Sequence, residues 1–241
     1  MPRMLSRSGR FIACSGAVRK NLIEHGIESG RIELVHVSIS VSNVCAQRSR
    51  EDVLRELNFP SDALVIVGCG PGSWNKGSDV FLWLARSVCK QRERARFVWL
   101  GDVPLLHYEH DIDKSGLGGK VRFIGSVARP ADYISAADVF ALTSREDSFP
   151  LVCLEAAALG KPIVCFADAG GMPEFVEDDA GFVVPYLDIE TMASRVIALV
   201  DSRECRRILG ETARRKVGER HDVSKAAPRI VNIIEATMAG R

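Results

Sequence analysis

The sequence has no strong excess of charge of either sign. Its 241 residues carry 32 lysines and arginines against 31 aspartates and glutamates, which gives a formal net charge of +1. A nucleic-acid-binding domain usually shows a basic patch and a high isoelectric point. The balanced charge therefore gives no indication of a nucleic-acid partner.

Long apolar runs are also absent. No stretch approaches the roughly 20 residues that a membrane-spanning helix needs. The basic residues Arg3, Arg7 and Arg10 precede the apolar segment FIAC, which is too short for the core of a signal peptide. We therefore expect a cytoplasmic protein.

A basic cluster in the helix predicted over residues 203–220 leaves peripheral membrane contact open. Apolar residues intervene between its members, as in a helix that contacts a membrane surface, but a solvated helix face is the default interpretation. The cluster consists of Arg206, Arg207, Arg214, Arg215 and Lys216.

Paired cysteines are missing as well. The seven cysteines are scattered without any Cys-x-x-Cys spacing, and most lie in apolar runs, where a free thiol behaves as a small hydrophobic group. This pattern favours a reducing compartment over a disulfide framework. His107 and His110 are spaced so that a helix could present both to a metal, but no third ligand is evident, and no metal site is predicted.

Strand and helix patterns alternate along the chain, without an internal repeat. This order is typical of a parallel sheet covered on both faces, so we predict a Rossmann-like, doubly wound α/β fold. The predicted strands are Phe11–Cys14, Ile32–Val37, Leu64–Cys69, Arg96–Leu100, Val121–Ile124, Val139–Leu142, Pro162–Phe166 and Gly181–Val184. The predicted helices are Val18–His25, Glu51–Leu57, Ser78–Gln91, Ala131–Ala136, Leu151–Leu159, Pro173–Val176, Ile189–Val200, Arg203–Arg220 and Val223–Met238.

The acidic motif DSFPLVCLE, from Asp147 to Glu155, spans a predicted turn between a buried strand and a helix that Pro150 begins. Such a turn directs free backbone N–H groups and the positive end of the helix dipole at one point, where a diphosphate fits. Glu155 lies too far into the helix to cap it, so its carboxylate is available to a ribose diol. Asp147 could bind the hydroxyls of a sugar, although an acid at a helix start is often only a dipole partner.

A second strand-to-helix turn contains the segment PGSWNKG. Its glycines, Gly72 among them, let the backbone approach a ligand closely, and Lys76 could neutralise phosphate as a mobile point charge. Alone, such a turn is more often an ordinary loop. Here we expect Lys76 and the helix N–H groups to neutralise the phosphates, with Arg145 assisting.

The stretch SREDSFPLVCLEAAALGKPIVCFADAGGMPE resembles the donor-site signature of retaining glycosyltransferases with the GT-B fold. That signature has a Glu-x7-Glu motif, a Gly-Lys-Pro-hydrophobic strand and a Gly-Gly-x-Pro-Glu turn. Asp147 stands where the first Glu is expected, and Glu155 where the second is. The resemblance covers roughly residues 63 to 220, and several motifs agree in their order.

The resemblance implies the C-terminal half of a GT-B fold, which binds a nucleoside-diphosphate sugar for retaining hexosyl transfer, in a setting such as cell-envelope polysaccharide biosynthesis. Glu155 would bind the ribose and Asp147 the transferred sugar, and the segment VRFIGSV would frame the base. No cofactor besides the donor is expected. The implied catalytic residues are Asp147 and Lys76. The implied donor-binding residues are Gly72, Lys76, Phe123, Ile124, Gly125, Asp147, Ser148, Phe149, Pro150, Leu151, Val152 and Glu155. For Phe123 and Ile124, simple membership of the core is the competing interpretation.

The opening segment resembles the last strand, helix and strand of the acceptor domain of such enzymes. We therefore expect residues 1–44 to be a remnant of that domain with a linker, 45–222 the nucleotide-sugar-binding domain, and 223–241 a C-terminal helix. Catalysis needs donor, acceptor and a closed cleft together, so this chain alone should bind donor with little transfer. Its expected partner is the missing N-terminal domain or a second copy, either of which would cover an apolar patch.

Three other functions remain open at this point. A sugar-nucleotide epimerase shares the fold, and a non-catalytic nucleotide-binding module would bind without turnover. A glycosidase is a poorer fit, because its two carboxylates oppose each other across the scissile bond, whereas Asp147 and Glu155 share one loop and helix.

Overall fold

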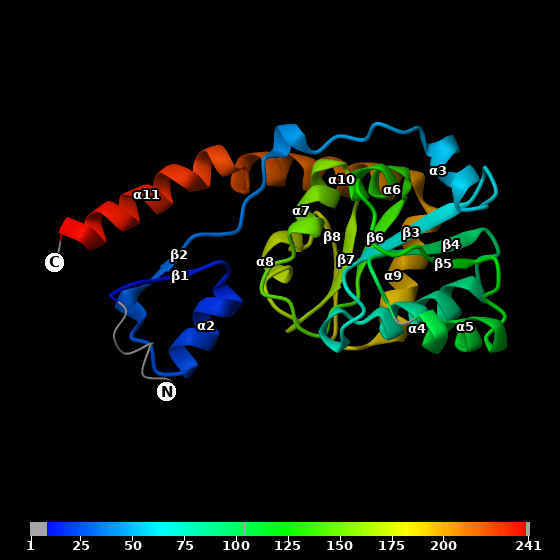
Figure 1. Ribbon diagram of the computed structural model, residues 1–241, viewed down its shortest axis with the longest axis horizontal. Helices are drawn as coiled ribbons and strands as arrows, with labels where there is room; N and C mark the ends of the chain where they lie inside the picture. The colour runs from blue at the N-terminus through cyan, green and yellow to red at the C-terminus, as the bar shows by residue number, and fades with distance from the viewer. Residues whose placement is uncertain (1–8, 104, 240–241) are drawn as a thin grey trace.

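A six-stranded, fully parallel sheet forms the centre of the larger part of the molecule, at the right of Figure 1. The computed structural model describes residues 9–103 and 105–239. The strands are β3 (Leu64–Cys69), β4 (Ala95–Leu100), β5 (Val121–Phe123), β6 (Val139–Leu142), β7 (Ile163–Phe166) and β8 (Gly181–Val184). All four residues of β6 and of β7 are buried, which explains why these strands appear in the sequence as continuous apolar runs.

The strand order β5-β4-β3-β6-β7-β8 places a switch point between β3 and β6. The chain runs outward from β3 to β5, returns to the other side of β3, and then runs outward again to β8. The turns that follow β3 and β6 therefore diverge from neighbouring strand ends. In open α/β sheets, ligands bind at such a point.

Helices cover both faces of the sheet, so the predicted doubly wound α/β fold is confirmed. One face packs against α4 (Ser78–Cys89), α5 (Leu105–Lys114) and α9 (Ile189–Asp201). The other packs against α3 (Arg50–Glu56), α6 (Pro130–Ala136), α7 (Leu151–Ala158), α8 (Pro173–Val176) and α10 (Arg203–Arg220).

A small N-terminal unit lies beside this sheet domain. It consists of β1 (Phe11–Ala13), α2 (Gly16–Glu24) and β2 (Ile32–Leu34), with the two strands paired in parallel. After β2 the chain crosses to the sheet domain and passes the end of α10. There the Ile39 N–H donates to the His221 carbonyl at 2.9 Å. The last helix, α11 (Val223–Ala239), then extends away from the sheet (Figure 1).

Two elements differ from the prediction. Helix α5 was not predicted, because Tyr108 and Ile112 form only a narrow stripe against the sheet, and the other positions from 109 to 114 are polar. Strand β2 ends at Leu34 instead of Val37, since β1 pairs over three residues only before Ser15 caps α2. Most other boundaries agree within one or two residues.

Candidate functional site

The structure brings the two predicted catalytic residues together at the switch point. Lys76 ends the short 3₁₀ helix η3 (Trp74–Lys76) after β3, and Asp147 lies on the loop after β6. The Lys76 Nζ lies 2.5 Å from the Asp147 Oδ2, and the two side chains are only 23% and 11% exposed. This ion pair joins the two loops across the switch point.

Gly77 makes this approach possible. Its φ of 68° is left-handed, and a Cβ at this position would lie 2.1 Å from the carbonyl oxygen of Thr143 at the end of β6. Only glycine fits so close to another backbone in this conformation. The Lys-Gly sequence therefore places the lysine beside β6 for a steric reason.

Arg145 does not assist Lys76, contrary to the prediction. Its buried guanidinium donates to both oxygens of Asp79, at 2.9 and 2.6 Å, and to the Trp74 carbonyl at 2.9 Å. The exposed Trp74 ring lies over it, 5.1 Å from the guanidinium carbon. These hydrogen bonds lower the pKa of Asp79. Arg145 therefore holds η3 in position and is not available to a phosphate.

The N-terminus of α7 presents free donors, as predicted. Pro150 occupies the N-cap position, and no side chain caps the helix. Within residues 9–103 and 105–239, no hydrogen bond is found for the backbone N–H groups of Ser148, Phe149, Leu151 and Val152. The first turn also contains no acidic residue. Unsatisfied N–H groups and the helix dipole together suit an anion.

The paired glycines of the GGMPE segment allow a third loop to join the site. The Asp147 N–H donates to the Ala169 carbonyl at 2.7 Å, and Asp147 forms a bridge with Gly170. A Cβ on Gly170, whose φ is 132°, would lie 1.7 Å from the Asp147 carbonyl oxygen. The loops after β6 and β7 therefore lie in direct backbone contact.

Glu155 lies one turn into α7 and is partly buried. No hydrogen bond to its carboxylate is found in the described part of the chain, and burial raises its pKa. It lines a cavity of about 190 Å³ with the linker residues Asn43, Val44 and Cys45 and the loop that leads into α6. The carboxylate is thus free for a ligand, as the sequence indicated.

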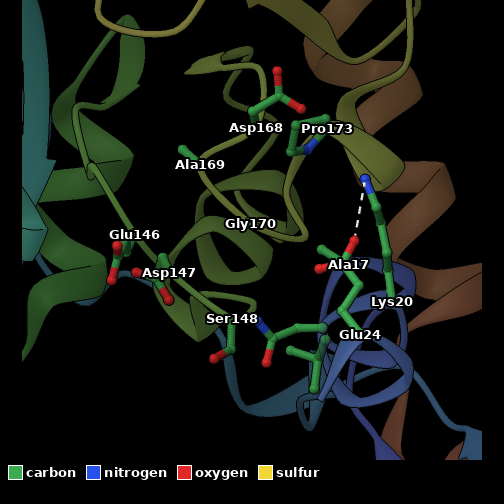
Figure 2. A pocket seen from close by; sticks show the side chains of 12 residues that line it. Ala17, Lys20, Glu24, Glu146, Asp147, Ser148, Asp168, Ala169, Gly170 and Pro173 are labelled. Atoms are coloured by element: carbon green, nitrogen blue, oxygen red, sulfur yellow. Dashed lines mark ion pairs between the residues drawn. The ribbon is translucent and has the colours of Figure 1, made fainter. Parts of the chain in front are cut away.

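Asp147 lines a different and larger cavity, of about 570 Å³, between α2 and the sheet domain (Figure 2). Lys20, Asn21 and Glu24 contribute from α2. The opposite wall comes from the loops after β6 and β7, through Glu146, Asp147, Ser148, Asp168, Ala169 and Gly170. No pattern in the sequence pointed to the α2 residues, because only the tertiary fold carries α2 to this loop. Asp147 and Glu155 therefore face separate spaces, which argues against a glycosidase pair.

The predicted base-framing side chains at the end of β5 belong to the core. The Phe123 ring stacks on Tyr108 with centroids 4.9 Å apart, and Ile124 packs against the apolar cluster on the other face. Gly125 takes a left-handed φ of 70°. A nucleobase could therefore contact mainly backbone atoms at this end of β5. That this segment frames the base stays a prediction.

Asp102, which the sequence analysis missed, organises this end of the sheet. Its carboxylate accepts from the Ser126 N–H at 2.9 Å and from the Ser126 hydroxyl at 2.8 Å. Its carbonyl accepts from the Gly72 N–H at 2.6 Å. The two bonds from Ser126, the hydroxyl bond first, lower the pKa of the Asp102 carboxyl. The Gly72 amide is consequently occupied, and its predicted contact with a donor would have to use other atoms.

Glu174, which ends the GGMPE segment, binds the N-terminal unit. Its two carboxylate oxygens accept from the N–H groups of Gly16 and Ala17, both at 2.8 Å. The His36 Nε2 lies 3.3 Å from the same carboxylate. Glu174 thereby caps α2 from another part of the chain.

Two remaining predictions have mixed outcomes. Lys216 does not belong to a solvated face: it is fully buried, with its Nζ 2.9 Å from Glu177 and 2.6 Å from Asp179.

The side chain of His107 lies outside the described residues. Across the positions that are described, no group of three or more His, Cys, Asp or Glu side chains could hold a metal ion. In the same part of the chain, no helix is long and apolar enough to cross a membrane.

Comparisons with known proteins agree on one family. The family described as "Glycosyl transferases group 1" matches residues 49–216. The chain is 29% identical to the sulfoquinovosyl transferase SQD2 of Arabidopsis thaliana, over 90% of this chain and 42% of that protein. It is 28% identical to a D-inositol 3-phosphate glycosyltransferase of Kineococcus radiotolerans, over 89% of this chain and 54% of that protein. The chain thus spans about half the length of these relatives.

The solved structure of HepE from Anabaena, in complex with UDP and glucose, superimposes with a TM-score of 0.86 at 21% identity. The match covers 95% of this chain and 63% of that one. This likeness confirms the Rossmann-like α/β fold, which the chain shares with GT-B glycosyltransferases.

Proposed function

This chain belongs to the group 1 glycosyltransferases, and we propose that it is the donor-binding half of an enzyme that transfers a hexosyl group from a nucleoside-diphosphate sugar with retention. One observation carries the proposal. Two separate cavities, one lined by Glu155 and the other by Asp147, flank an α7 N-terminus whose N–H groups are free.

A nucleoside-diphosphate sugar has three parts that match these three features. The ribose diol would lie in the smaller cavity, where the Glu155 carboxylate has no hydrogen-bond partner in the described part of the chain. The diphosphate would lie over the N–H groups of Ser148, Phe149, Leu151 and Val152, and the sugar would extend into the larger cavity beside Asp147. Charge-assisted hydrogen bonds from hydroxyls to carboxylates are among the stronger polar contacts in proteins.

Lys76 would stabilise the departing nucleoside diphosphate. As the bond to the sugar breaks, negative charge develops on the phosphate oxygens, and preorganised cations and N–H groups lower the energy of that state. The Lys76 ammonium is already held at the site by Asp147, so little reorganisation is needed. The ion pair with Lys76 would also hold the Asp147 carboxylate beside the larger cavity, where the sugar would lie. No cofactor is needed for these roles.

Support for the nucleotide comes from the structural relative. HepE was solved in complexes with UDP, with UDP-glucose and with UDP and glucose. We propose that the present chain binds such donors and shows little transfer by itself, because the acceptor side of the reaction needs a partner: an N-terminal domain or a second copy. We also propose a role in cell-envelope polysaccharide synthesis and a peripheral membrane location.

The test is a calorimetric titration with UDP, GDP, ADP and their sugar conjugates. Replacing Glu155 by Ala should weaken binding of the preferred diphosphate by about 1.5–3 kcal/mol, the range for a hydrogen bond to a charged group. Glu109→Ala, on the exposed surface of α5, is the matched control and should leave the affinity unchanged. Failure to bind any nucleoside diphosphate, or equal affinity in both variants, would overturn the proposed site.

A further inference from the structure

The larger cavity carries a marked excess of negative charge. Its charged lining residues are one lysine, Lys20, and four acids: Glu24, Glu146, Asp147 and Asp168. Figure 2 shows the Lys20 and Glu24 side chains paired with each other on α2, and Asp147 on the facing loop. The ammonium lies 3.9 Å from the Glu24 carboxylate, so the only cation of the lining is next to an acid.

Two of the four acids have no counter-ion. Asp147 is paired with Lys76, and Glu24 with Lys20. For Glu146 and Asp168, no ion pair or side-chain hydrogen bond is found among residues 9–103 and 105–239. Both are exposed and lie in the loops that follow the neighbouring strands β6 and β7, at the same edge of the sheet.

A ligand in this cavity therefore experiences a negative field. Hydroxyl groups are suited to it, because they donate hydrogen bonds to carboxylates. A carboxylate, sulfonate or phosphate on the ligand would instead approach like charges, and the lining cation Lys20 is already paired with Glu24. The field is that of exposed groups, so dissolved salt should screen it.

We infer that the cavity beside Asp147 selects a donor whose sugar carries no anionic group, a neutral hexose rather than a uronic acid. This inference rests on the proposed function, because that function puts the sugar end of the donor here. It concerns the charge of the sugar, which the family membership leaves open, and it assigns the discrimination to Glu146 and Asp168.

The test compares two donors that differ in one carboxylate. UDP-glucose and UDP-glucuronic acid are titrated in low salt, or GDP-mannose and GDP-mannuronic acid if the chain prefers GDP. We expect the uronic acid donor to bind at least about tenfold more weakly, the order expected for one or two close like-charge contacts near a surface. In 0.5 M NaCl the ratio should shrink to about twofold or threefold.

The cause is tested with a double variant, Glu146→Gln with Asp168→Asn. Asn suits the left-handed φ of 57° at position 168. This variant should bring the low-salt ratio close to one. The matched control, Glu109→Gln with Asp113→Asn on the exposed face of α5, removes the same charge away from the cavity and should keep the wild-type ratio.

The outcomes separate the two claims. If no nucleoside diphosphate binds, the proposed function fails and the inference fails with it. If UDP or GDP binds but the two donors bind equally, the inference alone is overturned. A tenfold ratio that the double variant leaves unchanged also overturns it, because the discrimination then has another source.

Discussion

The sheet domain and the N-terminal unit are held in place by different forces. Buried apolar side chains fill both faces of the sheet, with Phe140 on one face and Phe166 on the other fully buried. Among the described residues, the apolar core of the N-terminal unit has three buried members, Ala13, Ile27 and Ile32. Helices α2 and α11 contain no buried residue within their described parts.

Polar contacts instead determine where the N-terminal unit sits. Glu174 binds the first two N–H groups of α2, and the His221 Nδ1 lies 2.8 Å from the Val37 carbonyl oxygen. One substitution can remove a polar contact of this kind completely. One substitution in a large apolar core removes only part of the stability that the core provides. The wall of the larger cavity that α2 provides therefore depends on a few hydrogen bonds.

The largest expected effect is in the sheet. Phe140→Ala should lower the free energy of unfolding by about 3–5 kcal/mol, because the side chain is fully buried and leaves a cavity. Urea unfolding followed by circular dichroism measures this change. The control is Val231→Ala on α11, where the side chain is 50% exposed and the expected change is within about 0.5 kcal/mol. Similar losses in both variants would contradict the contrast between the two regions.

A smaller and local effect is expected at Glu174. Glu174→Ala should ease opening of the N-terminal unit by about 1–3 kcal/mol, through the loss of two charge-assisted hydrogen bonds to α2. Hydrogen exchange should speed up in residues 16–37 while the urea midpoint of the sheet domain stays nearly constant. Glu235→Ala on the exposed surface of α11 serves as the control. Unchanged exchange in α2 would show that other contacts hold the unit.

The smallest effect is a pH dependence at His221. Burial lowers the pKa of His221 below its usual 6.5, and the neighbouring His36, Arg220 and Lys216 act in the same direction. The unfolded chain then binds this proton more readily than the folded one. Stability from this group is therefore complete above pH 6.5 and is lost as pH falls through the folded pKa.

His221→Phe should remove this part of the acid sensitivity, since a Phe ring can also stack on Phe149, whose centroid lies 5.2 Å away. The measurement is the urea midpoint of both proteins at pH 7.5 and at pH 5. The wild type should lose more stability than the variant. An equal loss in both would assign the acid sensitivity to other groups.

Much of the sheet could be predicted because its signal is local. The strands Leu64–Cys69, Val139–Leu142 and Gly181–Val184 have the predicted boundaries, since each is a short, mostly apolar run that the local sequence delimits. Helix α5 escaped prediction because too few of its residues face the core. The N-terminus of α7 was predicted from Pro150 and the loop before it, and its free N–H groups are present as expected.

The partners of charged side chains could not be predicted. Arg145 binds Asp79 instead of facing the anion site, and Lys216 is buried between two acids instead of being solvated. Glu174 caps a helix more than 150 positions earlier in the chain. Such contacts form between residues that are distant in sequence, so no spacing along the chain encodes them.

By itself, the order of apolar runs, glycines and prolines determined the parallel strands, the turns at their carboxyl ends and the helix whose N-terminus faces an anion. These features depend on backbone conformation and burial within a few residues, which local sequence dictates. Only the tertiary structure decided that Lys76 meets Asp147, that Glu155 and Asp147 face separate cavities, and that α2 completes the larger one with its own charges. Electrostatic contacts depend on distance through space, and the fold alone sets that distance.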